Sequence, residues 1–144
     1  MRIAIIGTGK MGRGFAQALA PTHDVVVGSR TRDKATATAL KTGATAGATY
    51  PEAAVGADVV ILTVPWNAMD ETLGQLGNPT GTVVIDVSYP YNKREREALK
   101  GTSTAELIQM RLPNARVFKG WNHVRQAPDR PAGPRHRLVG VDHR

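Results

Sequence analysis

The chain has 144 residues, which fits one domain with a single hydrophobic core. Hydrophobic residues make up 41% of the sequence and aromatic residues only 5%, so the core must consist mainly of Val, Ile, Leu and Ala. The absence of cysteine excludes disulfides, cysteine-ligated metals and thiol catalysis. The net charge of +7 is dispersed and forms no basic stripe with interleaved aromatic residues, which favours anionic small molecules over nucleic acid as partners.

Short apolar runs alternate with segments of helical spacing along most of the chain. The run Arg2–Ile6 ends at a glycine, as buried strands often do, whereas Met11 and Phe15 recur at helical spacing until Pro21 ends the pattern. In chain order we expect a strand at 2–6, a helix at 10–20, a strand at 23–28, a helix at 31–41, a weak strand at 44–46, one or two helical turns at 51–55, a strand at 58–64, a helix at 67–76, a strand at 82–87, a loop over 88–102, a helix at 103–112 and a strand at 116–119. This alternation predicts right-handed βαβ crossovers and an α/β fold with a doubly wound, mostly parallel sheet.

The composition changes near residue 125. We therefore expect a dinucleotide-binding Rossmann domain over 1–124 and a Pro/Arg-rich tail over 125–144, irregular apart from a short edge strand at 138–141. No apolar run approaches the length of a membrane span or of a signal peptide's apolar region, so a cytoplasmic location without membrane contact is expected.

A glycine-rich turn joins the first expected strand to the first expected helix. Gly7, Gly9 and Gly12 match the pattern G-x-G-x-x-G. In dinucleotide-binding domains the first glycine permits a tight turn, the second lets a pyrophosphate approach the backbone, and the third lets the helix pack closely on the sheet. Free N–H groups at the helix N-terminus then face the phosphates. The competing interpretation is a tight turn in a domain that binds nothing.

The residues after the second strand predict the type of dinucleotide. NAD-specific domains usually carry Asp or Glu there, whereas this chain has Ser29 and Arg30, followed by Arg32 and Lys34. A 2′-phosphate is a dianion that needs donors and positive charge, and a guanidinium can bind it in a fork. Asp33 is the one opposing charge, and it suits the start of a helix. The sequence therefore predicts NADP(H), with a solvated basic loop as the alternative.

Three groups of residues together resemble the coenzyme F420-dependent NADP reductases. They are the glycine turn, the stretch Val26–Arg30 with Lys34, and the stretch Leu62–Trp66, and residues 104–122 are similar to a later part of that family. The resemblance implies NADP(H) and the deazaflavin F420 as cofactors. It implies that Ser29, Arg30 and Lys34 hold the 2′-phosphate. It places at the cofactor the turn residues Thr8, Lys10 and Met11 and the fourth-strand loop residues Val64, Pro65 and Trp66.

Hydride transfer between NADPH and an acceptor needs stacked rings rather than a nucleophile or a metal. The candidate orienting or acid–base residues are Ser88, which follows the fifth strand, and Asn122 and His123, which follow the last strand. Their alternatives are a loop hydroxyl bonded to backbone for Ser88 and a solvated loop histidine for His123. The histidines show no metal-ligand spacing, so no metal site is expected.

Two classes of function remain open at this stage. The first is an NADP(H)-dependent oxidoreductase that passes hydride between NADPH and F420 or a similar small-molecule acceptor. The second is an NADP(H)-binding module, a sensor or accessory protein without catalysis of its own, because the chain is shorter than the family it resembles. In both cases a sheet that ends at a short strand leaves an apolar edge, which predicts a homodimer.

Overall fold

The computed structural model describes residues 1–121. The tail expected at 125–144, its short strand at 138–141 and the candidate residues Asn122 and His123 lie outside the described residues.

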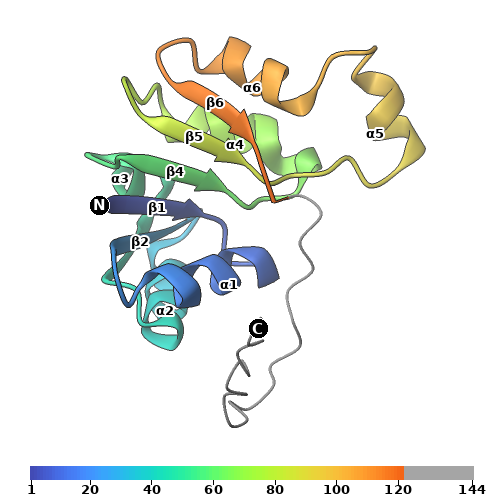
Figure 1. The fold of residues 1–144 in the computed structure, drawn as a ribbon. Coiled ribbons are helices and arrows are strands. Elements are labelled where there is room, and N and C mark those ends of the chain that lie inside the picture. The colour runs from blue at the N-terminus through green and yellow to red at the C-terminus, as the bar shows by residue number, and fades with distance from the viewer. Residues whose placement is uncertain (122–144) are drawn as a thin grey trace, which may run out of the picture.

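The fold is built on one sheet of six parallel strands in the order β3-β2-β1-β4-β5-β6 (Figure 1). The strands are β1 (Arg2–Ile6), β2 (Asp24–Ser29), β3 (Ala46–Thr49), β4 (Val59–Leu62), β5 (Val83–Asp86) and β6 (Arg116–Lys119). Each parallel pair is connected through at least one helix. The doubly wound α/β sheet expected from the sequence is therefore confirmed.

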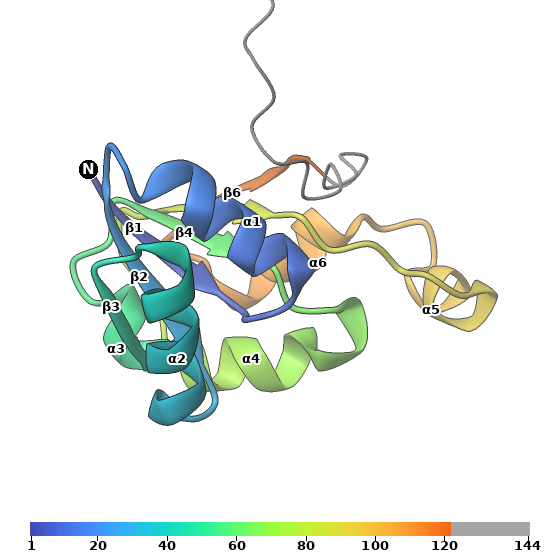
Figure 2. The ribbon, with the colours of Figure 1, turned by 90° about the horizontal axis from the view of Figure 1, so that it is seen from below.

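Helices cover both faces of the sheet (Figure 2). They are α1 (Lys10–Leu19), α2 (Arg32–Thr42), α3 (Tyr50–Ala54), α4 (Met69–Leu76), α5 (Lys93–Ala98) and α6 (Thr104–Arg111), and a 3₁₀ turn, η1 (Trp66–Ala68), precedes α4. α1 contacts α2 over β1 and β2, whereas α3 contacts α4 and α6 packs on β6. Figure 2 shows α1 and α4 on opposite sides of the sheet.

The sheet separates two hydrophobic clusters. Ile5 and Val27 face α1 and pack with Ala16, while Ile6 and Leu62 face the opposite side and pack with α3, α4 and α6. The buried residues are mainly Val, Ile, Leu and Ala, as the composition predicts, with Tyr50 and Met69 as additions. Strands buried on both faces are typical of parallel sheets, and they hold the strand ends in a fixed register.

One expected element is wrong: residues 88–102 are not entirely a loop, because they contain α5. Asn92 caps this helix by accepting from the N–H of Glu95 at 2.9 Å, and the Glu95 side chain accepts from the N–H of Asn92. Lys93 and Glu97 form an ion pair one turn apart. No residue of α5 is buried, and Figures 1 and 2 show it projecting from the rest of the fold. Because α5 is stabilised by its cap and buries no side chain, its sequence has no apolar periodicity from which the helix could be predicted.

The third strand is displaced from its expected position at 44–46 to Ala46–Thr49. Within it, Gly47 lies so close to α2 that a Cβ at this position would be 2.2 Å from the backbone nitrogen of Thr36. This approach of helix to strand depends on glycine, and alanine-rich sequence on both sides of Gly47 gives little periodicity to locate it.

Candidate functional site

The carboxyl ends of five strands lie in one row. The register pairs Gly28 with Ile6, Ile6 with Leu62, Leu62 with Asp86, and Asp86 with Lys119. The predicted site residues within 1–121 lie on the loops that begin at these strand ends, a few residues further along the chain. The order of the strands reverses between β1 and β4, and ligands of doubly wound sheets bind beyond the carboxyl ends at that point.

In the glycine turn between β1 and α1, a side chain would clash at two of the three glycines and would fit at the third. Gly7 has φ +122°, and a Cβ there would lie 2.6 Å from Oγ1 of Thr63. A Cβ on Gly12 would lie 2.1 Å from the carbonyl oxygen of Gly7. A Cβ on Gly9 would meet nothing within 4 Å. The first and third glycines therefore serve the fold, whereas the space before Gly9 is open to a ligand that approaches the backbone.

The N-terminus of α1 begins at this open position. Gly9 is the N-cap, with no side chain capping the first turn, so the N–H groups of Lys10, Met11 and Gly12 are free of helical partners. Lys10 is exposed, and Met11 is half-buried against the α1-side cluster. Arg13, which the sequence analysis did not select, donates from Nη1 to the carbonyl oxygen of Thr8 at 3.0 Å. A cationic side chain thus steadies the turn, and the helix dipole adds positive potential there.

The tip of β2 lies beside this turn, because Gly7 N donates to Gly28 O at 3.0 Å. Ser29 is buried at the end of β2, and Arg30 follows it as an exposed side chain. Lys34 is exposed in the first turn of α2. Within residues 1–121 neither Arg30 nor Lys34 forms an ion pair, so two cations stand free at this corner.

Arg32 differs from the other cations of the corner. Its guanidinium donates to Glu52 Oε1 and forms an ion pair with it. The other oxygen of Glu52 accepts from the N–H and the hydroxyl of Thr49, at 2.9 and 2.6 Å, in the capping box of α3. These hydrogen bonds from Thr49, with the Arg32 charge beside them, hold the pKa of Glu52 below its ordinary value. The positive charge of Arg32 is therefore already shared with a carboxylate.

The loop after β4 packs against the glycine turn. Thr63 donates its hydroxyl to the carbonyl oxygen of Ile6 at 2.9 Å, and Val64 is buried next to the place where a Gly7 Cβ would be. Pro65 is exposed, and Trp66 is half-buried against the core cluster of α3, α4 and α6. Thr63 was not among the predicted site residues, although it stands in the quoted stretch Leu62–Trp66.

The loop after β5 holds a buried polar cluster that the sequence analysis missed. Asp86 is fully buried and accepts from the N–H of Ser88 at 2.8 Å, from Thr104 Oγ1 at 2.7 Å and from Lys119 Nζ at 2.8 Å. Ser88 itself is 4% exposed, and within the described chain its Oγ has no hydrogen-bond partner. A carboxylate at the end of a buried strand needs a cation, and that requirement was the signal available in the sequence.

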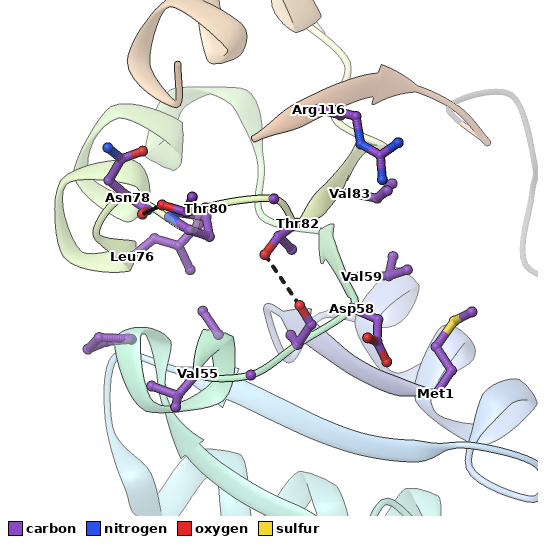
Figure 3. A pocket seen from close by; sticks show the side chains of 16 residues that line it. Met1, Val55, Asp58, Val59, Leu76, Asn78, Thr80, Thr82, Val83 and Arg116 are labelled. Carbon is purple, nitrogen blue, oxygen red and sulfur yellow. Dashed lines mark hydrogen bonds between the residues drawn. The ribbon is translucent and has the colours of Figure 1, made fainter. Parts of the chain in front are cut away.

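A further cavity lies at the opposite, amino edge of the sheet (Figure 3). It measures about 850 Å³ and is lined by small residues and by apolar side chains that include Met1 and Leu76, together with Asp58, Asn78 and Arg116. Asp58 accepts from the backbone N–H of Arg2 at 2.7 Å, and the buried hydroxyl of Thr82 donates to the carbonyl oxygen of Ala57. These polar groups are used by the fold, and none of the predicted site residues lies there.

Residues 1–121 contain no group of three or more His, Asp or Glu side chains placed to share a metal ion. In the same part of the chain, no helix combines the length and the apolar character that a membrane crossing requires.

The strand order, the glycine turn and the helix N-terminus define this domain as a Rossmann-type nucleotide-binding fold. Comparison with known proteins identifies the family within this fold. A family model described as NADP oxidoreductase, coenzyme F420-dependent, matches residues 2–90. The F420-dependent NADP reductase of Methanothermobacter thermautotrophicus is 41% identical over 101 residues, which cover 62% of this chain and 44% of the relative.

Two solved structures extend the comparison. A candidate F420-dependent NADP reductase from Arthrobacter sp. FB24 superposes with a TM-score of 0.69 and 26% identity, over 83% of this chain and 61% of the other. A reductive aminase from Aspergillus terreus, solved with NADPH and ethyl-5-oxohexanoate, gives a TM-score of 0.59 and 28% identity, over 83% and 39%. The chain belongs to the coenzyme F420-dependent NADP oxidoreductase family. It spans about half the length of the curated reductases that it matches.

Proposed function

We propose that this domain binds NADP(H) and serves an oxidoreductase that transfers hydride between NADPH and a deazaflavin such as F420. The observation that carries the proposal is the corner formed by the tip of β2 and the N-terminus of α1. There Arg30 and Lys34, which form no ion pair with another residue of 1–121, lie beside a turn that is open at Gly9. Membership of the family and the NADPH-bound reductive aminase support the same cofactor.

Each part of NADP(H) has a matching group in this chain. The free N–H groups at the start of α1 suit the pyrophosphate, flanked by Thr8, Lys10 and Met11. Ser29, Arg30 and Lys34 suit the 2′-phosphate. Arg32 would contribute less to binding this phosphate, because it already forms an ion pair with Glu52. Val64, Pro65 and Trp66 line the loop next to the turn, and Ser88 offers a hydroxyl for the nicotinamide end.

The bound cofactor supplies the hydride, so the protein contributes binding, orientation and exclusion of water. A Ser88 hydroxyl can donate to and accept from a carboxamide, which would orient a nicotinamide ring. The candidates Asn122 and His123 follow β6 in sequence and remain proposals for the same crevice.

The decisive measurement is a titration of the protein with NADPH and with NADH. We expect tight binding of NADPH and weak binding of NADH. Arg30→Asp should weaken NADPH by about 1.5–3 kcal/mol, the scale of a charge-assisted hydrogen bond, and leave NADH nearly unchanged. Arg94→Asp, an exposed change on α5, is the matched control and should alter neither. Equal losses for both dinucleotides would contradict a 2′-phosphate role for Arg30.

An acceptor screen then separates the two functional classes. Oxidation of NADPH when F420 is added supports the reductase, and turnover with flavin, imine or carbonyl acceptors would redirect the assignment of the acceptor. Tight NADPH binding without turnover across these acceptors would support the binding module, a sensor or accessory protein. That result would support the assignment of NADP(H) as the cofactor and contradict the assignment of reductase activity.

We further propose that the protein acts in the cytoplasm as a homodimer. On the α1 side of the sheet, β5 and β6 carry Val83 and Ile85 half-buried and Phe118 54% exposed, with Trp121 49% exposed beside them. An apolar surface of this kind is suited to burial against a second copy. Light scattering should give twice the mass of one chain, and a monomeric mass would contradict the dimer.

A further inference from the structure

Within residues 1–121, every polar side chain of the cluster at the ends of β5 and β6 has a hydrogen-bond partner except one. Lys119 Nζ donates to Asp86 Oδ2 and Thr104 Oγ1, both at 2.8 Å, and to the carbonyl oxygen of Ser88. Asp86 in turn accepts from the N–H of Ser88. The ammonium group thus has three acceptors, and both backbone groups of Ser88 are held. The one atom of the cluster without a partner in the described part of the chain is the buried Oγ of Ser88.

Stability alone does not account for such a pair. Asp86 is 0% exposed and the Lys119 side chain 30% exposed, so the carboxylate is removed from water and the ammonium group is partly removed from it. Apolar residues of similar volume often serve stability as well as a buried ion pair does, or better. The pair instead fixes the backbone position of Ser88, because Asp86 accepts from its N–H and Lys119 donates to its carbonyl oxygen.

We propose that Asp86 and Lys119 are positioning residues: they fix the peptide groups of Ser88 at the carboxyl edge, from where a turn about its Cα–Cβ bond brings the buried hydroxyl to the carboxamide of the nicotinamide. This inference rests on the proposed function, because it assumes that NADP(H) lies along that edge. The adenine half of the cofactor belongs to the tip of β2, on the other side of β1. The pair therefore acts on the nicotinamide half alone, and binding of the two halves can be measured separately.

The experiment compares NADPH with 2′,5′-ADP, which carries the 2′-phosphate but lacks the nicotinamide. Ser88→Ala should weaken NADPH about three- to tenfold, the effect of one lost hydrogen bond, and leave 2′,5′-ADP unchanged. Lys119→Met should give a similar selective loss. Adding Ser88→Ala to Lys119→Met should cause little further loss, because both changes remove the same contact. Lys41→Met, an exposed change on α2, is the matched control.

Because Lys119→Met leaves a buried carboxylate without its cation, this variant is at risk of failing to fold. The double variant Asp86→Asn with Lys119→Met removes both charges, keeps an acceptor for the Ser88 N–H, and still releases the Ser88 carbonyl. It should melt near the wild type and show the same selective loss of NADPH. Wild-type NADPH affinity in this folded variant, or parallel losses of NADPH and 2′,5′-ADP, would overturn the inference. A wild-type protein that binds neither ligand would instead overturn the proposed function, and the inference with it.

Discussion

The α-carbon of Gly12 faces the carbonyl oxygen of Gly7 at such short range that a Cβ there would lie 2.1 Å from the oxygen. The helix start and the strand end are therefore in contact through backbone alone. Gly9, between them in sequence, has open space on the corresponding side. The three glycines of one motif thus have different physical roles, and the roles can be separated by substitution.

Gly12→Ala should destabilise the fold, whereas Gly9→Ala should not. The first change forces backbone apart, and overpacking of this kind typically costs about 1–3 kcal/mol. Gly9 has φ −72° and ψ −171°, which alanine adopts freely. Gly9→Ala should therefore melt like the wild type but bind NADPH more weakly, since its methyl group occupies the cofactor's approach. Thermal melts and NADPH titrations test the pair, and a stable Gly12→Ala protein with full affinity would contradict this view of the turn.

Thr63→Val should weaken both the fold and cofactor binding. The Thr63 hydroxyl donates to the Ile6 carbonyl at the turn, and a lost hydrogen bond of this type costs about 1 kcal/mol. Thr82→Val is the matched control, because its buried hydroxyl makes a similar bond to Ala57 at the opposite edge of the sheet. Both variants should lose similar stability in urea melts, and only Thr63→Val should lose NADPH affinity. Equal affinities in the two variants would remove Thr63 from the site.

Glu52→Gln should raise affinity for NADPH. The carboxylate of Glu52 holds Arg32 in an exposed ion pair, and exposed pairs of this kind are weak. Neutralising it releases the guanidinium toward a neighbouring phosphate, with an expected gain of roughly twofold. NADH affinity should not change. Glu106→Gln removes a capping-box carboxylate that has no cation beside it within residues 1–121, and it serves as the control. Weaker NADPH binding in Glu52→Gln would show that the ion pair itself supports the site.

Stability should fall in acid partly through Glu106. Its pKa lies below the ordinary value of 4.5, because the Ser103 backbone N–H and then the Ser103 hydroxyl hydrogen-bond to its carboxylate. A carboxyl whose pKa is lower in the folded state stabilises the fold fully above its unfolded pKa. That contribution disappears as the pH falls through the folded pKa. Urea melts from about pH 7 down to about pH 3 should therefore show a shallower acid loss for Glu106→Gln than for wild type. Identical pH profiles would contradict a role for this cap.

The sequence predicted the elements whose local signals agree with their packing. The short apolar runs and the segments of helical spacing between them predicted the sheet and most helices. The helix α5 was not predicted, because its stability comes from a polar cap and an i,i+4 ion pair rather than from an apolar face. Periodicity reports burial, and α5 has none.

The cofactor corner could be read from the sequence because a strand tip and a helix start are adjacent along the chain in a βαβ unit. The sequence alone therefore determined the fold class, and it predicted the residue types that we propose for an anionic dinucleotide. Only the tertiary structure decided which charges are free: Glu52 lies 20 residues from Arg32, and Lys119 lies 33 residues from Asp86. Ion pairs between distant segments depend on strand register and helix placement, and no local pattern encodes them.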